Sequence, residues 1–177
     1  MSIDLVVEDG TMPDGANTYA DIDFADAFLA SRGAAEWAVA DEDTKAAAII
    51  RATDTLNSYR WKGLPVEDTR IMAWPRTGVV YASGAGVPAD TVPIQVKNAT
   101  CELAGNIVAT HTDPLAQIDA SVGAVTSEKV DVIGVSYAAP ETNAYTGKTG
   151  FPFIDALLRP FLKSNGKGLS VVELGRG

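Results

Sequence analysis

The 177-residue chain has one cysteine, Cys101, and one histidine, His111. A single cysteine cannot form a disulfide within the chain, and together the two residues are too few for a Cys/His zinc cluster. The sequence also lacks an apolar run approaching the ~20 residues that a membrane-spanning helix needs. Its first residues do not join a basic region to an apolar core, as a secretory signal does. We therefore expect no cofactor, no metal and no membrane, and synthesis in the cytosol.

Basic residues are scarce as well. The chain has 14 Lys and Arg against 23 Asp and Glu, for a formal net charge of −9. A protein that grips a phosphate backbone tightly usually carries a basic face. This chain can present one only if its fold segregates the charges. The acidic balance by itself suits a surface past which nucleic acid slides without sticking.

No arrangement of residues predicts catalysis. A Ser-His-Asp triad would have to use His111, which has no nucleophile-elbow motif nearby. The segment Thr146–Gly150 resembles part of a phosphate-binding loop, but Thr142 stands where that motif requires its first glycine. We therefore expect a protein that is not an enzyme.

Apolar residues at helical spacing predict a mainly α fold. Helix-start signals precede four such stretches, at Asp21–Asp23, Asp41–Thr44, Pro93 and Pro152, and Trp37 marks a further helical turn. Alternating residues around Ile133 indicate a strand with a bend or a tight hairpin. We expect a compact four-to-five-helix domain with a small β-hairpin or strand pair and extended N- and C-terminal arms.

This organisation divides the chain into three parts. Residues 1–18 hold strong turn signals and form an N-terminal arm or strand. Residues 19–163 form the helical domain, including a loop at 62–92 and the β segment at 126–138. Residues 164–177 are expected to be a flexible C-terminal tail, because the tail begins with the glycine-containing linker Ser164-Asn165-Gly166-Lys167-Gly168.

Two stretches combine aromatic and basic residues. In Trp74-Pro75-Arg76, we expect a structural anchor: Trp74 buries its ring, Pro75 keeps the preceding backbone extended, and Arg76 fixes the loop or an adjacent subunit. In Tyr59-Arg60-Trp61-Lys62, aromatic and basic side chains alternate. That pattern suits either a helix end meeting the core or a stacking platform for single-stranded nucleic acid.

The tail contains a short β-prone run, Leu169–Leu174. Such a segment can add as an edge strand to another chain, or it can be a frayed end. The side chains expected to bind a partner in the first case are Leu169, Val171, Val172 and Leu174.

Several landmarks in a fixed order resemble a family encoded by tailed bacteriophages. They extend over roughly residues 17–162 and include Tyr19-Ala20-Asp21, Ile50-Arg51-Ala52-Thr53-Asp54, Ala73-Trp74-Pro75-Arg76-Thr77-Gly78, Val96-Lys97-Asn98-Ala99-Thr100-Cys101 and Phe151-Pro152-Phe153-Ile154-Asp155. The group is often labelled as DnaT-like single-stranded-DNA-binding proteins, and its members are similar to head–tail connector, or neck adaptor, proteins.

The connector resemblance implies a structural virion protein at the head–tail interface, assembled in the host cytoplasm. It would form a homo-oligomeric ring, a dodecamer, beneath the portal protein, and would extend the channel for double-stranded DNA. It would also join the portal to a downstream neck, stopper or tail protein, with the C-terminal tail reaching the portal. The alternative implication is a DnaT-like module that binds single-stranded DNA. The net charge of −9 favours the connector at this stage, because an acidic wall suits a channel better than a tight grip.

Overall fold

The computed structural model describes residues 3–112, 128–130, 133–135 and 151–163, and five helices form the framework of this part of the chain. The helices are α1 (Ile22–Ala30), α2 (Ala35–Val39), α3 (Glu42–Asn57), α4 (Ile94–Thr110) and α5 (Pro152–Leu158). Four short strands form two antiparallel pairs, β1 (Leu64–Pro65) with β2 (Arg76–Thr77), and β3 (Glu128–Val130) with β4 (Ile133–Val135). The prediction of a mainly helical domain with small β elements is confirmed.

The helix boundaries follow from local signals in the sequence. Asp21 caps α1 by accepting a 2.7 Å hydrogen bond from the Phe24 backbone, and Asp41 caps α3 in the same way through Thr44. Helix α4 ends at Thr110 and is capped by His111, which has a left-handed backbone and donates its N–H to the Ile107 carbonyl. Helix α5 stops at Leu158, because Pro160 cannot continue the helical hydrogen bonds.

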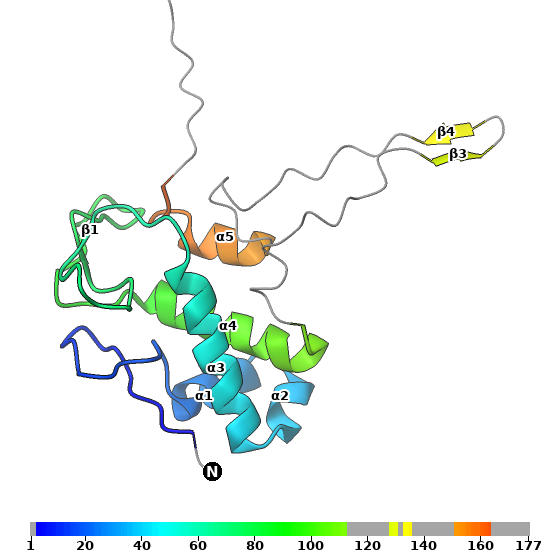
Figure 1. Ribbon diagram of the computed structural model, residues 1–177, viewed down its shortest axis with the longest axis horizontal. Helices are drawn as coiled ribbons and strands as arrows, with labels where there is room; N and C mark the ends of the chain where they lie inside the picture. The colour runs from blue at the N-terminus through cyan, green and yellow to red at the C-terminus, as the bar shows by residue number, and fades with distance from the viewer. Residues whose placement is uncertain (1–2, 113–127, 131–132, 136–150, 164–177) are drawn as a thin grey trace, which may run out of the picture.

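The core forms where α3 packs along α4. Figure 1 shows these two long helices crossing at the centre, with α1 and α2 on one side of α4 and α5 on the other. Each helix contributes one apolar stripe, as its periodicity predicts. Fully buried members include Ile49 and Leu56 from α3, Leu103 from α4 and Ile154 from α5. Cys101 is also buried on α4, among apolar neighbours.

Lys45 lies in the core, although lysine side chains usually face solvent. Its side chain forms a 2.9 Å ion pair with Asp26, and its ammonium sits 5.5 Å from the centre of the Trp37 ring. The Trp37 indole N–H donates to the same Asp26 oxygen at 2.6 Å. Lys45 is buried because Asp26 of α1 and Trp37 of α2 converge on this side of α3, a tertiary arrangement that helical spacing does not reveal.

The N-terminal segment lies against its own domain. Only an isolated bridge, Val7 to Thr18, replaces the short strand expected there. The Glu8 carboxylate is fully buried and accepts hydrogen bonds from the backbone of Gly10 and Met12. Arg70 approaches the same carboxylate at 3.3 Å and also donates to the Met12 carbonyl. The pair therefore ties this segment to the loop at 62–92.

Burial raises the pKa of the Cys101 thiol to about 12. In the unfolded chain a thiol titrates near about 8.5, so the unfolded state loses this proton at a lower pH than the folded state. Stability contributed by the neutral thiol is therefore complete below about pH 8 and is lost as the pH rises toward 12. Between about pH 8 and 10, we expect the free energy of unfolding of the native protein to fall by roughly 1–2 kcal/mol more than that of Cys101→Ala, as measured by urea unfolding. An identical pH dependence in both proteins would contradict the assignment.

Candidate nucleic-acid interface

Two short segments, far apart in the sequence, meet beside the end of α3. Trp61 and Leu162 form an antiparallel bridge. The Lys62 N–H donates to the Phe161 carbonyl at 2.8 Å, and the Lys163 N–H donates to the Arg60 carbonyl at 2.8 Å. These paired hydrogen bonds hold the chain after α3 next to the chain after α5.

The pairing gathers four basic side chains, which we call the basic cluster: Arg60, Lys62, Arg159 and Lys163. Residues 59–63 and 159–163 contain no acidic residue. Arg159 and Lys163 are exposed. The Lys62 ammonium donates to the Pro160 carbonyl at 2.7 Å, and an ammonium has three donors, so this bond leaves two of them for other acceptors. The fold thus concentrates positive charge within an acidic chain.

An aromatic cluster lies beneath the basic cluster and consists of Trp61, Trp74, Tyr81 and Phe161. Edge-to-face contacts join Trp74 to Trp61 at 5.5 Å and to Phe161 at 5.7 Å between ring centres, and Tyr81 meets Phe161 at 5.9 Å. Such geometry is favourable because the positive edge of one ring faces the negative face of the next. The aromatic cluster therefore fixes the two segments that carry the basic residues.

The stretch Tyr59–Lys62 divides its side chains between core and surface. Trp61 is only 3% exposed, and its indole N–H donates to the Leu56 carbonyl at 3.0 Å, so its ring faces are covered. Tyr59 is half-buried with its ring 6.3 Å from that of Trp61. Arg60 is exposed. Of the two aromatic rings in the stretch, Tyr59 is thus the one with a partly open surface.

Trp74 and Arg76 hold the loop against the end of α3. Trp74 is 1% exposed and follows Ala73, whose N–H donates to the Asn57 side chain at 3.0 Å. The Trp74 N–H donates to the Tyr19 hydroxyl at 3.1 Å, and that hydroxyl in turn donates to Asn57 at 2.5 Å. The Trp74–Pro75 peptide bond is cis.

The Arg76 guanidinium is largely buried and donates to three backbone carbonyls. These belong to Lys62, Gly63 and Ala73, at 2.8, 3.0 and 2.9 Å. Removal from water lowers the pKa of Arg76 from its usual value. Gly63 has φ +67°, and a Cβ there would lie 2.1 Å from the Thr77 carbonyl oxygen, so only glycine fits this turn. Arg76 therefore positions the backbone of Lys62.

The basic cluster was only half visible in the sequence. Arg60 and Lys62 belong to the aromatic–basic stretch, whereas Arg159 and Lys163 lie ~100 positions later with no comparable pattern around them. A usable signal was Pro160, which ends the helix and turns the following residues back toward α3. The other residues predicted to bind a partner, Leu169, Val171, Val172 and Leu174, lie outside the described residues.

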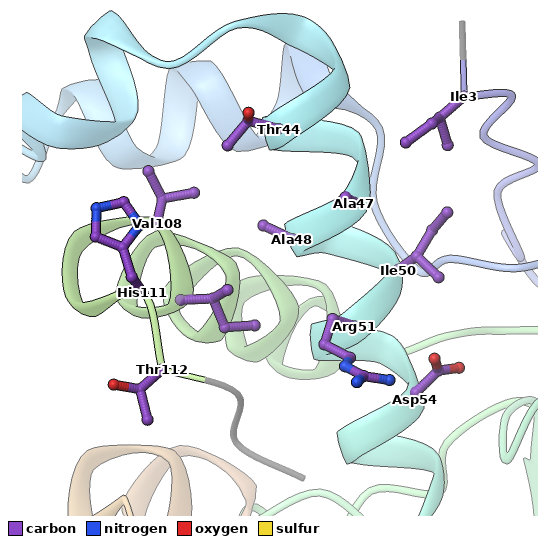
Figure 2. A pocket seen from close by; sticks show the side chains of 11 residues that line it. Ile3, Thr44, Ala47, Ala48, Ile50, Arg51, Asp54, Val108, His111 and Thr112 are labelled. Atoms are coloured by element: carbon purple, nitrogen blue, oxygen red, sulfur yellow. The ribbon is translucent and has the colours of Figure 1, made fainter. Parts of the chain in front are cut away.

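A groove of about 650 Å³ lies on another part of the domain, between α3 and the end of α4. Figure 2 shows Ala48 of α3 pointing toward Val108 of α4, with Ile3 on the far side of α3. Its lining residues are Ile3, Thr44, Ala47, Ala48, Ile50, Arg51, Asp54, Ile107, Val108, His111 and Thr112.

In the part of the chain that the structure describes, no set of three or more His, Cys, Asp or Glu side chains gathers as metal ligands would. None of the helices in that part combines the length and apolar character needed to cross a membrane.

The sequence matches a family model over residues 3–177, and the family is described as "Putative DnaT-like ssDNA binding protein". The chain belongs to this family. No curated protein and no solved structure matches the chain. The resemblance to DnaT-like proteins is therefore confirmed.

The connector interpretation was wrong. The family description agrees with the alternative reading, a single-stranded-DNA-binding module, and gives no support to a neck protein of the virion. The expected partner is accordingly single-stranded DNA. The portal protein, the downstream neck or tail protein, the dodecameric ring and the channel for double-stranded DNA are no longer expected. The physical error was to judge a surface by the net charge of −9, because charge can gather locally once the chain folds.

Arg76→Lys should show how much the loop depends on the guanidinium. A lysine cannot reproduce three hydrogen bonds arranged by a planar fork. Leaving buried carbonyls without donors should lower the free energy of unfolding by about 1.5–3 kcal/mol, measured by urea denaturation. Arg32→Lys is the matched control, because Arg32 is exposed beside α1. Equal effects of the two substitutions would refute the anchoring role.

Proposed function

We propose that this protein binds single-stranded DNA without catalysis, and that the basic cluster contacts the phosphate backbone. The observation that carries the proposal is the match to the DnaT-like family over residues 3–177. The basic cluster supplies a physical basis for it, because backbone hydrogen bonds pair the segments that carry Arg60, Lys62, Arg159 and Lys163 within an otherwise acidic chain. Lys and Arg provide most of the phosphate contacts in protein–nucleic acid complexes.

The acidic remainder of the chain shapes this binding. Charges more than ~8–10 Å apart are largely screened at physiological salt, so a local group of cations attracts phosphate despite a negative total. Repulsion from the other faces confines the strand to the basic cluster. With only about four phosphate contacts, binding should be modest and strongly dependent on salt.

The half-buried ring of Tyr59, beside the basic cluster, contacts the bases of the bound strand. An aromatic face stacks on any base, which favours binding without a strict sequence preference. A single strand exposes its bases for such stacking, whereas a duplex keeps them paired. We therefore expect single-stranded DNA to bind more tightly than a duplex of the same length.

Neutralising Arg159 and Lys163 together, as Arg159→Gln with Lys163→Gln, should weaken binding to a fluorescent oligothymidine about tenfold or more at low salt, as measured by anisotropy. With four phosphates contacted, log K against log salt should have a slope of about −3 in the native protein and about −1.4 in the variant. Both side chains are exposed, so the stability should change by less than about 0.5 kcal/mol.

Arg32→Gln is the control for net charge. It also removes a positive charge, but beside α1, on the other side of α4 from α5 (Figure 1). The affinity of the Arg32→Gln variant for the oligothymidine should stay within about twofold of the native value, since distant exposed charges are screened. Absence of salt-dependent binding by the native protein, or equal weakening by Arg32→Gln, would overturn the proposal.

A further inference from the structure

The groove between α3 and α4 has an apolar floor and polar ends. Ala47, Ala48 and Ile50 line it from α3, and Ile107 and Val108 line it from α4. Asp54 marks the end nearer the C-terminus of α3, and Thr44 marks the other end. An apolar groove of this kind is suited to an apolar segment with polar flanks.

The chain itself contains a segment of that character. Leu169–Leu174 carries four large aliphatic side chains in six residues, and Lys167 and Arg176 lie on either side of it. These aliphatic groups gain free energy only if they leave water.

The tail begins close enough to reach the groove. Lys163 is held beside Arg60 by its backbone hydrogen bond, so the tail starts just past the end of α3. The five residues 164–168 span up to ~16–18 Å when extended. From Asp54 to the end of α3 at Asn57 is ~5 Å along the helix axis, at ~1.5 Å per residue. Arg60 lies three residues past Asn57, which adds up to ~10 Å, and the linker still covers the total.

The reach of the linker fixes the direction, because the Thr44 end of the lining lies ~20 Å from Asn57 along α3, beyond the ~16–18 Å that residues 164–168 span. The lining from Asp54 to Thr44 extends ~15 Å along α3, and six extended residues cover ~20 Å. A tail arriving from the C-terminal end of α3 brings Lys167 to Asp54 first. It then brings Arg176 toward Glu42 and Asp43, the acidic first turn of the helix. Opposite charges thus meet at the Glu42–Asp43 end, whereas Asp54 shares its end of the lining with Arg51.

We propose that Leu169–Leu174 docks in the α3–α4 groove of its own chain, running antiparallel to α3. This interaction is independent of the DNA-binding proposal, because the groove and the basic cluster share no residue. In this arrangement, an extended segment of the same molecule covers the apolar side chains of the groove.

A spin label tests the proposal in the full-length protein. Ser170→Cys places the label on a polar position within the docking segment, and the native Cys101 is buried and stays unmodified. In the docked state, the amide signals of Ala47, Ile50 and Ile107 should lose most of their intensity, and reduction of the label should restore them. The signals of the exposed α2 residues Ala38 and Val39 should keep theirs.

Two variants give the matched comparison. Val172→Asp alters only the tail, and with the label in place it should abolish the broadening of the groove signals while the circular dichroism stays unchanged. Ala47→Trp fills the groove and should have the same effect, whereas Ala109→Trp, at an exposed α4 position outside the groove, should not.

Three outcomes would overturn the proposal. The first is the absence of broadening at the groove in the labelled protein. The second is broadening that persists in Val172→Asp. The third is broadening that also arises when spin-labelled protein is mixed with a separate, unlabelled ¹⁵N protein, since that result would assign the groove to the tail of a second copy.

Discussion

The packing of Trp74 against Trp61 and Phe161 is the interaction on which the rest of the structure depends. These rings come from the loop, from the end of α3 and from the end of α5, so their contact joins three segments that are distant in sequence. Large aromatic side chains bury the area needed to hold such segments together. This packing brings together the segment after α3 and the segment after α5. The bridge between Trp61 and Leu162 and the basic cluster around it form for that reason.

Buried polar groups support the same junction. Arg76 satisfies three loop carbonyls, and the Tyr19–Asn57 pair receives the backbone N–H groups of Ala73 and Trp74. An irregular loop can lie against a core only if its backbone groups find such partners. Polar residues therefore hold this loop in place as much as apolar ones do.

The distribution of charge reconciles an acidic protein with a family of DNA-binding proteins. Lys45 and Arg76 are buried inside the domain, where Lys45 pairs with Asp26 and Arg76 donates hydrogen bonds to backbone carbonyls. Other cations gather at the surface in the basic cluster. Because screening limits electrostatic attraction to short distances, the position of charges matters more than their sum.

The sequence by itself determined the helices, their caps and the apolar stripes, because these depend on residues within a few positions of one another: Asp21 and Asp41 cap helices that local spacing predicts. It also pointed to Trp74 and to Arg60 and Lys62. Only the tertiary structure decided that Lys45 is buried, that Trp61 is covered, and that Arg159 and Lys163 join Arg60. Those outcomes depend on contacts between segments up to about a hundred residues apart, which no local pattern encodes.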